Sequence, residues 1–203
     1  PNYDATVTPR YYADRGTMLE GQFRYITENF GEGKISGAYL PEDKKYNDQD
    51  RKDLKFLHNW DINDYWSTNL EYNYASDKDF TADLNSSPDS KTDLNLRRAW
   101  VLNYKNQIPG LKAQLKVEDF QTLDKTVADI DRPYARLPQF LLNYVTGNPL
   151  GLQYEFNNDT AYFKKDISDT NNYSTQPSGT RIYNQFAARY NFRNTYAFAI
   201  PEV

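Results

Sequence analysis

Apolar and polar residues alternate along the first segment of the chain. The even positions of residues 2–11 carry Asn2, Asp4, Thr6, Thr8 and Arg10, and the odd positions carry Tyr3, Ala5, Val7, Pro9 and Tyr11. Successive side chains of a β-strand point to opposite faces, so a period of two indicates a strand. This segment therefore predicts a strand with one apolar face and one wet face.

The same alternation recurs along most of the chain, and no stretch shows a convincing helical period. We predict about ten strands, each near the roughly 9–11 residues that a tilted membrane strand needs. Beyond the first, they fall at 19–25, 35–40 (the weakest), 54–61, 66–74, 94–104, 111–118, 140–144, 152–157 and 181–190, with a last one near Tyr196.

The predicted connections alternate between tight and long. Tight turns rich in Gly, Asn and Pro fall at 29–33, 63–65, 105–110 and 146–150, and long polar connections at 41–52, 75–91, 123–136 and 164–180. Outer-membrane barrels have short periplasmic turns and longer external loops. The predicted fold class is therefore all-β, an antiparallel up-and-down transmembrane β-barrel segment. A soluble antiparallel sandwich also has period two, but it has less reason to sort its loops in this way.

Aromatic residues gather near the ends of the predicted strands. In a membrane barrel they form two girdles at the interfaces, whereas in a soluble sheet they form cross-strand pairs. Because the loops are sorted, we favour the girdles. The residues concerned are Tyr11, Tyr12, Tyr25, Tyr39, Trp60, Tyr65, Trp66, Tyr74, Tyr104 and Tyr144.

The composition fits a single sheet that forms the wall of a barrel better than a domain with a large aliphatic core. Hydrophobic residues make up 38% of the 203 residues, which is low for a globular domain, yet 16% are aromatic, which is too many for a disordered chain. The absence of Cys excludes disulfides, thiolate metal sites and a cysteine nucleophile. A net charge of -4 argues against a nucleic-acid partner.

Few residues suggest catalysis. His58, the one histidine, lies on the apolar side of its strand, so a packed or interfacial position is favoured over a catalytic one. Carboxylate pairs such as Glu118 with Asp119, or Asp129 with Asp131, are expected by coincidence among 28 acidic residues. Arg97 and its neighbour Arg98 would point to opposite faces, which weakens a phosphate clamp. We predict no enzyme, and no catalytic, metal or cofactor site.

Pro9 is the most informative single residue, because proline cannot donate a ladder hydrogen bond in the middle of a strand. Two interpretations are open: a harmless β-bulge, or a deliberately weak strand pairing.

The opening of the chain resembles the start of the barrel in the lipopolysaccharide-assembly outer-membrane protein family, LptD/OstA. The resemblance is carried by Pro1-Asn2-Tyr3-Asp4-Ala5-Thr6-Val7-Thr8-Pro9-Arg10-Tyr11, by Asp14-Arg15-Gly16, and by Glu20-Gly21-Gln22-Phe23-Arg24-Tyr25. It is strong over the first 45 residues or so and topological afterwards. It implies that residues 1–203 form one region, the early strands of a larger barrel, without the family's periplasmic jelly-roll and later strands.

The resemblance also implies a function, which is to pass lipopolysaccharide into the outer leaflet of the outer membrane. Pro9 would weaken the pairing at a lateral gate between the first and last strands. Asn2, Asp4, Thr6, Thr8 and Arg10 would face the hydrophilic lumen. The implied partners are lipopolysaccharide, a plug lipoprotein (LptE-like) in the lumen, and a periplasmic bridge protein (LptA-like) docked on the missing jelly-roll.

Two other classes of protein share the periodicity. A fragment of another outer-membrane barrel, such as a porin or receptor, would lack the opening motif. A secreted, Tyr-rich, carbohydrate-binding β-sandwich would be soluble without detergent.

Overall fold

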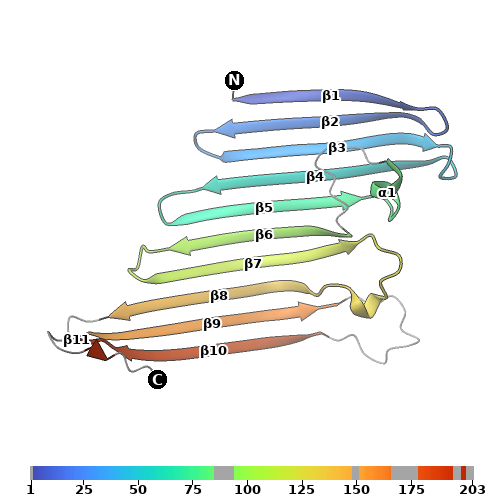
Figure 1. The fold of residues 1–203 in the computed structure, drawn as a ribbon. Helices are drawn as coiled ribbons and strands as arrows, with labels where there is room; N and C mark the ends of the chain where they lie inside the picture. Colours follow the sequence, from blue (N-terminus) through green and yellow to red (C-terminus); the bar gives the residue numbers. More distant parts are fainter. Residues whose placement is uncertain (1, 85–93, 148–150, 166–177, 194–197, 200–203) are drawn as a thin grey trace.

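The computed structural model describes residues 2–84, 94–147, 151–165, 178–193 and 198–199. Its main feature is one antiparallel sheet in which strands β1 to β10 follow each other in chain order (Figure 1). The strands are β1 (Tyr3–Tyr12), β2 (Gly16–Thr27), β3 (Gly31–Asp43), β4 (Gln49–Asp61), β5 (Trp66–Ala75), β6 (Asn95–Lys105), β7 (Leu111–Thr122), β8 (Ala135–Gly147), β9 (Leu152–Lys164) and β10 (Gly179–Tyr190).

This order confirms the predicted all-β, up-and-down antiparallel class with about ten strands. The sheet is open, since β1 and β10 lie at its two edges and do not pair with each other. Two short strands, β11 (Phe192–Arg193) and β12 (Phe198–Ala199), pair separately. The last strand predicted near Tyr196 lies outside the described residues. In the described part of the chain, no helix is long and apolar enough to cross a membrane.

The predicted sorting of the connections is confirmed in part. The four predicted tight turns lie at one end of the sheet and the longer connections at the other, but that second end also carries the short turn between β1 and β2 (Figure 1). However, 41–52 is not a long loop, because Pro41 to Asp43 complete β3 and β4 begins at Gln49. These strand ends are polar, so their extension has no hydrophobic pattern to reveal it. The weak strand predicted at 35–40 is likewise the middle of the longer β3.

A second correction concerns helices, since none was predicted. The connection after β5 contains the short helix α1 (Phe80–Leu84), and the connection before β8 contains the 3-10 turn η1 (Asp129–Asp131). A single helical turn is too short to show a periodic pattern. In α1 both Phe80 and Leu84 are fully buried, which explains why so short a helix is held in place.

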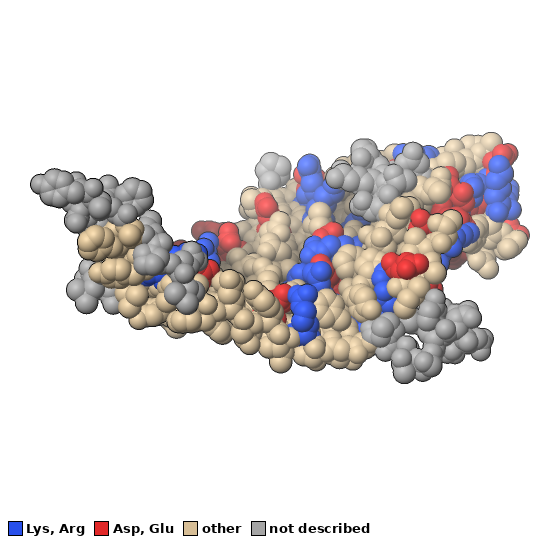
Figure 2. All heavy atoms as spheres, turned by 60° about the horizontal axis from the view of Figure 1, so that its bottom comes forward, with Lys and Arg blue, Asp and Glu red and all other residues tan. Residues whose placement is uncertain are grey.

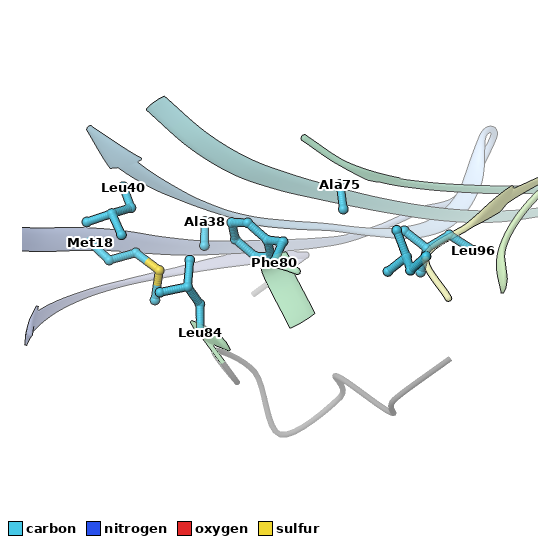
Figure 3. Close-up of a cluster of buried hydrophobic side chains, with 8 residues drawn as sticks. Met18, Ala38, Leu40, Ala75, Phe80, Leu84 and Leu96 are labelled. Atoms are coloured by element: carbon cyan, nitrogen blue, oxygen red, sulfur yellow. The ribbon is translucent and has the colours of Figure 1, made fainter. Parts of the chain in front are cut away.

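The buried hydrophobic cluster lies between α1 and the ends of the strands. Phe80 and Leu84 point toward Met18, Ala38 and Leu40 on the sheet (Figure 3). The other members of the cluster are Ala75, Leu96 and Leu123, with Tyr12 packed against it. The helix therefore closes the only part of the described sheet that forms a compact core.

The ladder register places apolar residues on one face of the sheet. One row of directly opposed residues on this face runs through Tyr3, Tyr25, Gly33, His58, Leu70, Trp100 and Val117. Gly33 is needed in this row, because a Cβ there would lie 2.4 Å from Cζ of Tyr25. The ring of Tyr25 can thus cross Gly33, and its hydroxyl lies 2.8 Å from Nδ1 of His58.

Aromatic residues gather at the ends of this apolar face, although Tyr12 of the predicted set lies on the opposite face, where it packs against the buried cluster. At the tight-turn end the rings of Trp66 and Tyr104 lie 4.9 Å apart, centre to centre, and those of Phe30 and Trp60 lie 6.0 Å apart. At the other end Tyr39 lies opposite Lys52, and Tyr11 opposite Thr17. Cross-strand pairs of this kind are compatible with interfacial girdles.

The backbone ladder is interrupted between β5 and β6. Their pairing stops at Tyr72 opposite Arg98, although β5 itself continues to Ala75. Side chains replace the missing bonds. Arg98 Nε donates to the carbonyl of Asn73 at 3.0 Å, and Gln121 of β7 both accepts from Ala75 N at 3.2 Å and donates to Ala75 O at 2.7 Å.

We expect Gln121→Leu to expose the backbone of Ala75, because the substitution removes both partners of that residue. Exchange of the Ala75 amide hydrogen should accelerate by about tenfold, the effect of losing one ordinary hydrogen bond. Hydrogen exchange of the full-length protein in detergent measures this rate. Gln114→Leu in the same strand is the matched control, because Gln114 donates to the Asn103 side chain and not to backbone. Equal exchange of Ala75 in wild type and Gln121→Leu would contradict the bridging role.

Candidate functional site

β1 is an edge strand and pairs only with β2 among the described residues. The two strands face each other one to one, from Tyr3 opposite Tyr25 to Tyr12 opposite Gly16. Pro9 lies opposite Leu19 within this unbroken register. The interpretation of Pro9 as a β-bulge is therefore wrong. The predicted strand also begins one residue later than expected, because Asn2 lies outside β1.

The hydrogen-bonding direction of β1 follows from its first pair. Ile26 N donates to the carbonyl of Asn2 at 2.7 Å, so these opposed residues form a hydrogen-bonded pair. Such pairs alternate along an antiparallel ladder. The even-numbered residues of β1 therefore bond to β2, and the odd-numbered residues direct their N–H and C=O groups to the free edge. Pro9 is odd-numbered, so its missing donor leaves the pairing with β2 intact and removes one donor from the free edge.

The even-numbered side chains of β1 lie on the polar face of the sheet, as the alternation predicts. Arg24 of β2 binds both carboxylate oxygens of Asp4, at 3.0 and 2.8 Å. Arg10 donates to Glu20 at 3.3 Å. Thr6 and Thr8 lie between these two ion pairs, opposite Gln22 and Glu20. The structure thus brings Asp4, Thr6, Thr8 and Arg10 together with polar residues of β2. That this face borders a lumen stays a prediction.

The polar face continues across the sheet as a series of ion pairs. Arg97 lies between Glu71, at 2.6 Å, and Glu118, at 2.8 Å, and Arg136 also binds Glu118 at 3.0 Å. Near the other edge, Asp159 accepts from Arg181 at 2.6 Å. Figure 2 shows acidic and basic side chains next to one another at several places on the face in view. Glu118 therefore serves an ion-pair network and not a pair of catalytic carboxylates.

The remaining candidates from the sequence fall at separate places. Arg97 and Arg98 point to opposite faces, as predicted, because Arg98 lies under the rings of Tyr72 and Tyr74 on the apolar face. His58 stacks between Tyr25 and Phe56, which matches the packed position predicted for it.

Nothing in the sequence pattern distinguishes Arg51 of β4, which is among the most buried charged residues that the structure describes. Its guanidinium is completely buried and contacts three carboxylates. It binds Asp77 through two bonds of 2.7 and 2.9 Å, Asp43 at 3.0 Å and Asp83 at 2.9 Å. Arg15, from the turn after β1, binds Asp43 at 2.7 Å and Asp83 at 3.2 Å. We call these five residues the Arg51 cluster.

The Arg51 cluster ties the connection after β5 to the wall. Asp83 lies in α1 and Asp77 lies just before it, whereas Arg51 and Asp43 belong to the sheet. The Arg51 guanidinium also lies over the rings of Tyr46, at 4.3 Å, and Phe80, at 5.6 Å. Tyr12 of β1 adds a hydrogen bond to the carbonyl of Leu84 at 3.2 Å. The turn end of the β1–β2 hairpin is thus joined to α1 directly and to β4 through the Arg51 cluster.

Asp77 lies outside the strands and has a pKa that reports this docking. Burial alone would raise the pKa of the Asp77 carboxyl. Hydrogen bonds from Arg51 and Ser76 outweigh the burial and hold the pKa below its ordinary value of 3.8. The charged form is therefore the form that binds α1 to the sheet.

These observations define a class of protein. An antiparallel sheet with an apolar face rimmed by aromatic residues, a polar opposite face, and short turns at one end is typical of the wall of a membrane β-barrel. Among the described residues there is no cluster of three potential metal ligands.

Comparison with known proteins identifies the family. The family model described as LptD, LPS transport system D, matches residues 49–203. The chain is 79% identical over its whole length to the LPS-assembly protein LptD of Acinetobacter baylyi, and 74% identical to that of Acinetobacter baumannii. It is 40% identical to the protein of the same name from Psychrobacter cryohalolentis over 213 aligned positions. The chain belongs to the LptD family.

The chain spans about a quarter of the length of the curated relatives it matches, 25% of both Acinetobacter proteins and 21% of the Psychrobacter protein. The name of these relatives is that of an assembly protein and not of an enzyme.

Removing the Arg51 side chain should release α1. Arg51→Met removes the guanidinium from Asp77 and leaves Arg15 as the remaining cation beside the buried Asp43, a change that costs about 3 kcal/mol or more. We expect the α1 segment to open about a hundredfold more often. Exchange of the Asp83 amide hydrogen, which bonds to the carbonyl of Asp79 at 2.9 Å, measures this opening in the full-length protein.

The control for this prediction is Lys45→Met. Lys45 and Asp14 form an ion pair in which both side chains are more than half exposed, so its loss should leave α1 docked. Equal exchange in Arg51→Met and Lys45→Met would contradict the importance of the buried cluster.

Acid should have a similar effect on the docked segment. Because the folded-state pKa of Asp77 is lowered, its stabilising contribution is complete above pH 3.8 and is lost as the pH falls through the lower, folded-state value. Protease cleavage between residues 76 and 84, followed by mass spectrometry from pH 6 to pH 2 with an acid-active protease, should increase only below about pH 3.8. Asp77→Asn should be cleaved readily even at pH 6. Cleavage that rises already near pH 6 in the wild type would contradict this assignment.

Proposed function

We propose that this chain is part of the wall of an outer-membrane β-barrel that passes lipopolysaccharide into the outer leaflet, and that β1 forms one side of its lateral gate. The observation that carries the proposal is the position of Pro9, whose missing donor belongs to the free edge of an otherwise regular edge strand. Membership of the LptD family and the name of its relatives, LPS-assembly protein, support lipopolysaccharide as the transported substrate.

The two faces of the sheet suit the two parts of a glycolipid. Acyl chains match the face carrying Tyr3, Val7 and Tyr11, which are 70, 71 and 75% exposed. Sugars match the opposite face with its hydroxyl, amide and ion-paired groups. A gate at β1 would let the acyl part leave sideways while the sugars stay on the polar side. This division needs no covalent chemistry.

The remaining partners are part of the same proposal. A plug lipoprotein (LptE-like) would lie against the polar face, and a periplasmic bridge protein (LptA-like) would dock on a region outside this chain. The ion pairs of Arg97 with Glu71 and Glu118 give the polar face a surface that a polar protein can contact. Family membership favours this function over a porin, a receptor or a sugar-binding sandwich.

Pro9→Val should slow lipopolysaccharide delivery, because valine restores a donor at the free edge and strengthens the pairing of β1 with the strand across the gate. We expect less lipopolysaccharide at the cell surface and more disulfide cross-linking of cysteine pairs placed across the gate in the full-length protein. Unchanged surface lipopolysaccharide together with unchanged cross-linking would count against the gate.

Two neighbouring proline substitutions test the hydrogen-bonding direction itself. Val7→Pro removes another donor from the free edge, so the protein should still fold and its gate should loosen. Thr8→Pro removes a bond to β2, so it should destabilise the first hairpin by about 3 kcal/mol and lower the level of folded protein. Equal folding of the two variants would show that the odd-numbered residues of β1 do not face the free edge.

A further inference from the structure

A polar hollow lies directly behind the gate strand, on the polar face of the sheet. Its volume is about 190 Å³. Two rows of directly opposed residues line it, and each row contains one residue from each of the strands β1 to β4. The first row is Thr6, Gln22, Ser36 and Lys55, and the second is Thr8, Glu20, Ala38 and Asp53.

The shape of the hollow follows from the sizes of these side chains. Short residues make up most of its lining, at Thr6, Thr8, Gly21, Ser36, Gly37 and Ala38, and longer ones complete it. The Asp4–Arg24 ion pair lies in the next row toward the tight turns. Toward the longer connections, the next row contains Met18 and Leu40, which belong to the buried cluster under α1. The hollow is thus a partly enclosed site that lies between these two groups.

Its chemistry favours a ligand rich in hydroxyl groups. Hydroxyls and amides both donate and accept hydrogen bonds, and the hollow offers Thr6, Thr8, Ser36 and Gln22. Glu20 adds a carboxylate that has one oxygen without a hydrogen bond. Its Oε2 accepts from Arg10 at 3.3 Å, whereas its buried Oε1 has no hydrogen-bond partner in the described part of the chain. A buried acceptor without a donor is costly, so a ligand hydroxyl that reached it would be stabilised.

The charges of the hollow argue against an anionic ligand. The carboxylates of Glu20 and Asp53 face a single lining cation, Lys55, while Arg10 is already bound to Glu20. A phosphate or a sugar acid would meet two negative groups, whereas an uncharged sugar would not.

We propose that this hollow binds one neutral sugar unit of the lipopolysaccharide chain as it passes behind the gate. The inference rests on the proposed function and adds to it a place and a chemical class. Because Thr6 and Thr8 belong to β1, a bound sugar bridges the gate strand to β2, β3 and β4. The hollow therefore holds the sugar chain against the gate strand while the acyl part leaves on the other face.

Photocross-linking in the full-length protein tests this site. A photoreactive amino acid replaces Gln22 at the side of the hollow or, as a positional control, Phe23, which points to the opposite face. Cells making lipopolysaccharide with a complete core are compared with cells whose lipopolysaccharide lacks the neutral core sugars. The triple variant Thr6→Val, Thr8→Val and Ser36→Ala removes the hydroxyls with little change of shape.

We expect strong adducts at Gln22 with complete lipopolysaccharide. Their yield should fall about fivefold or more when the neutral sugars are missing, and by a similar factor in the triple variant, as the loss of two hydrogen bonds predicts. Thr17→Val, on the opposite face of the same hairpin, is the matched control and should change nothing. Thr8→Val alone gives a smaller decrease and shows that the loss does not come from a misfolded triple variant.

Two results would overturn the proposal, and they differ. Adducts at Gln22 that are insensitive to both sugar truncation and hydroxyl removal would exclude a sugar site while leaving the transport function standing. Absence of lipopolysaccharide adducts at Gln22, at Phe23 and at positions along β6 to β9 of the polar face would overturn the transport function itself, and the sugar site with it.

Discussion

The antiparallel pairing of neighbouring strands in one ladder is the constraint on which the other features depend. Each strand from β1 to β10 faces its neighbour in a defined register, so one apolar and one polar face run across the sheet. A shift by a single residue would exchange the two faces of a strand. The same ladder leaves β1 with a free edge and decides that Pro9 withholds its donor from that edge alone. The free edge, the apolar face and the polar face are thus consequences of one register.

Side chains take over where the ladder stops. At the ends of β5 and β6, Gln121 and Arg98 satisfy backbone groups that have no strand partner. At the neighbouring ends of β3 and β4, the buried Arg51 joins the sheet to α1 through Asp77 and Asp83. Both devices lie at the end that carries the longer connections. The first hairpin is therefore anchored at that end through Tyr12 and Arg15, while the long edge of β1 stays open for pairing.

The proposed transport function is compatible with the kinds of side chains that the structure presents. The described residues present surfaces rather than reactive groups, since the buried Arg51, Asp43 and Glu118 are ion-paired and the histidine stacks against aromatic rings. In the proposed function, selectivity comes from the match of each face of the sheet to a part of the transported lipopolysaccharide. The proposed sugar site behind β1 would make that match specific at one point, because its partly unpaired carboxylate and its hydroxyls are arranged by four adjacent strands.

The sequence by itself determined the strands, their two faces and the sorting of the turns, because a period of two and a turn composition are local properties. It also pointed to Pro9. It could not show the ends of β3 and β4 or the single turn of α1, which lack a periodic pattern. Only the tertiary structure decided which edge Pro9 faces, that Arg51 meets Asp77 and Asp83, and that a hollow lies beside Thr8. The reason is physical: these features depend on groups that are remote along the chain and become neighbours only when the strands pair.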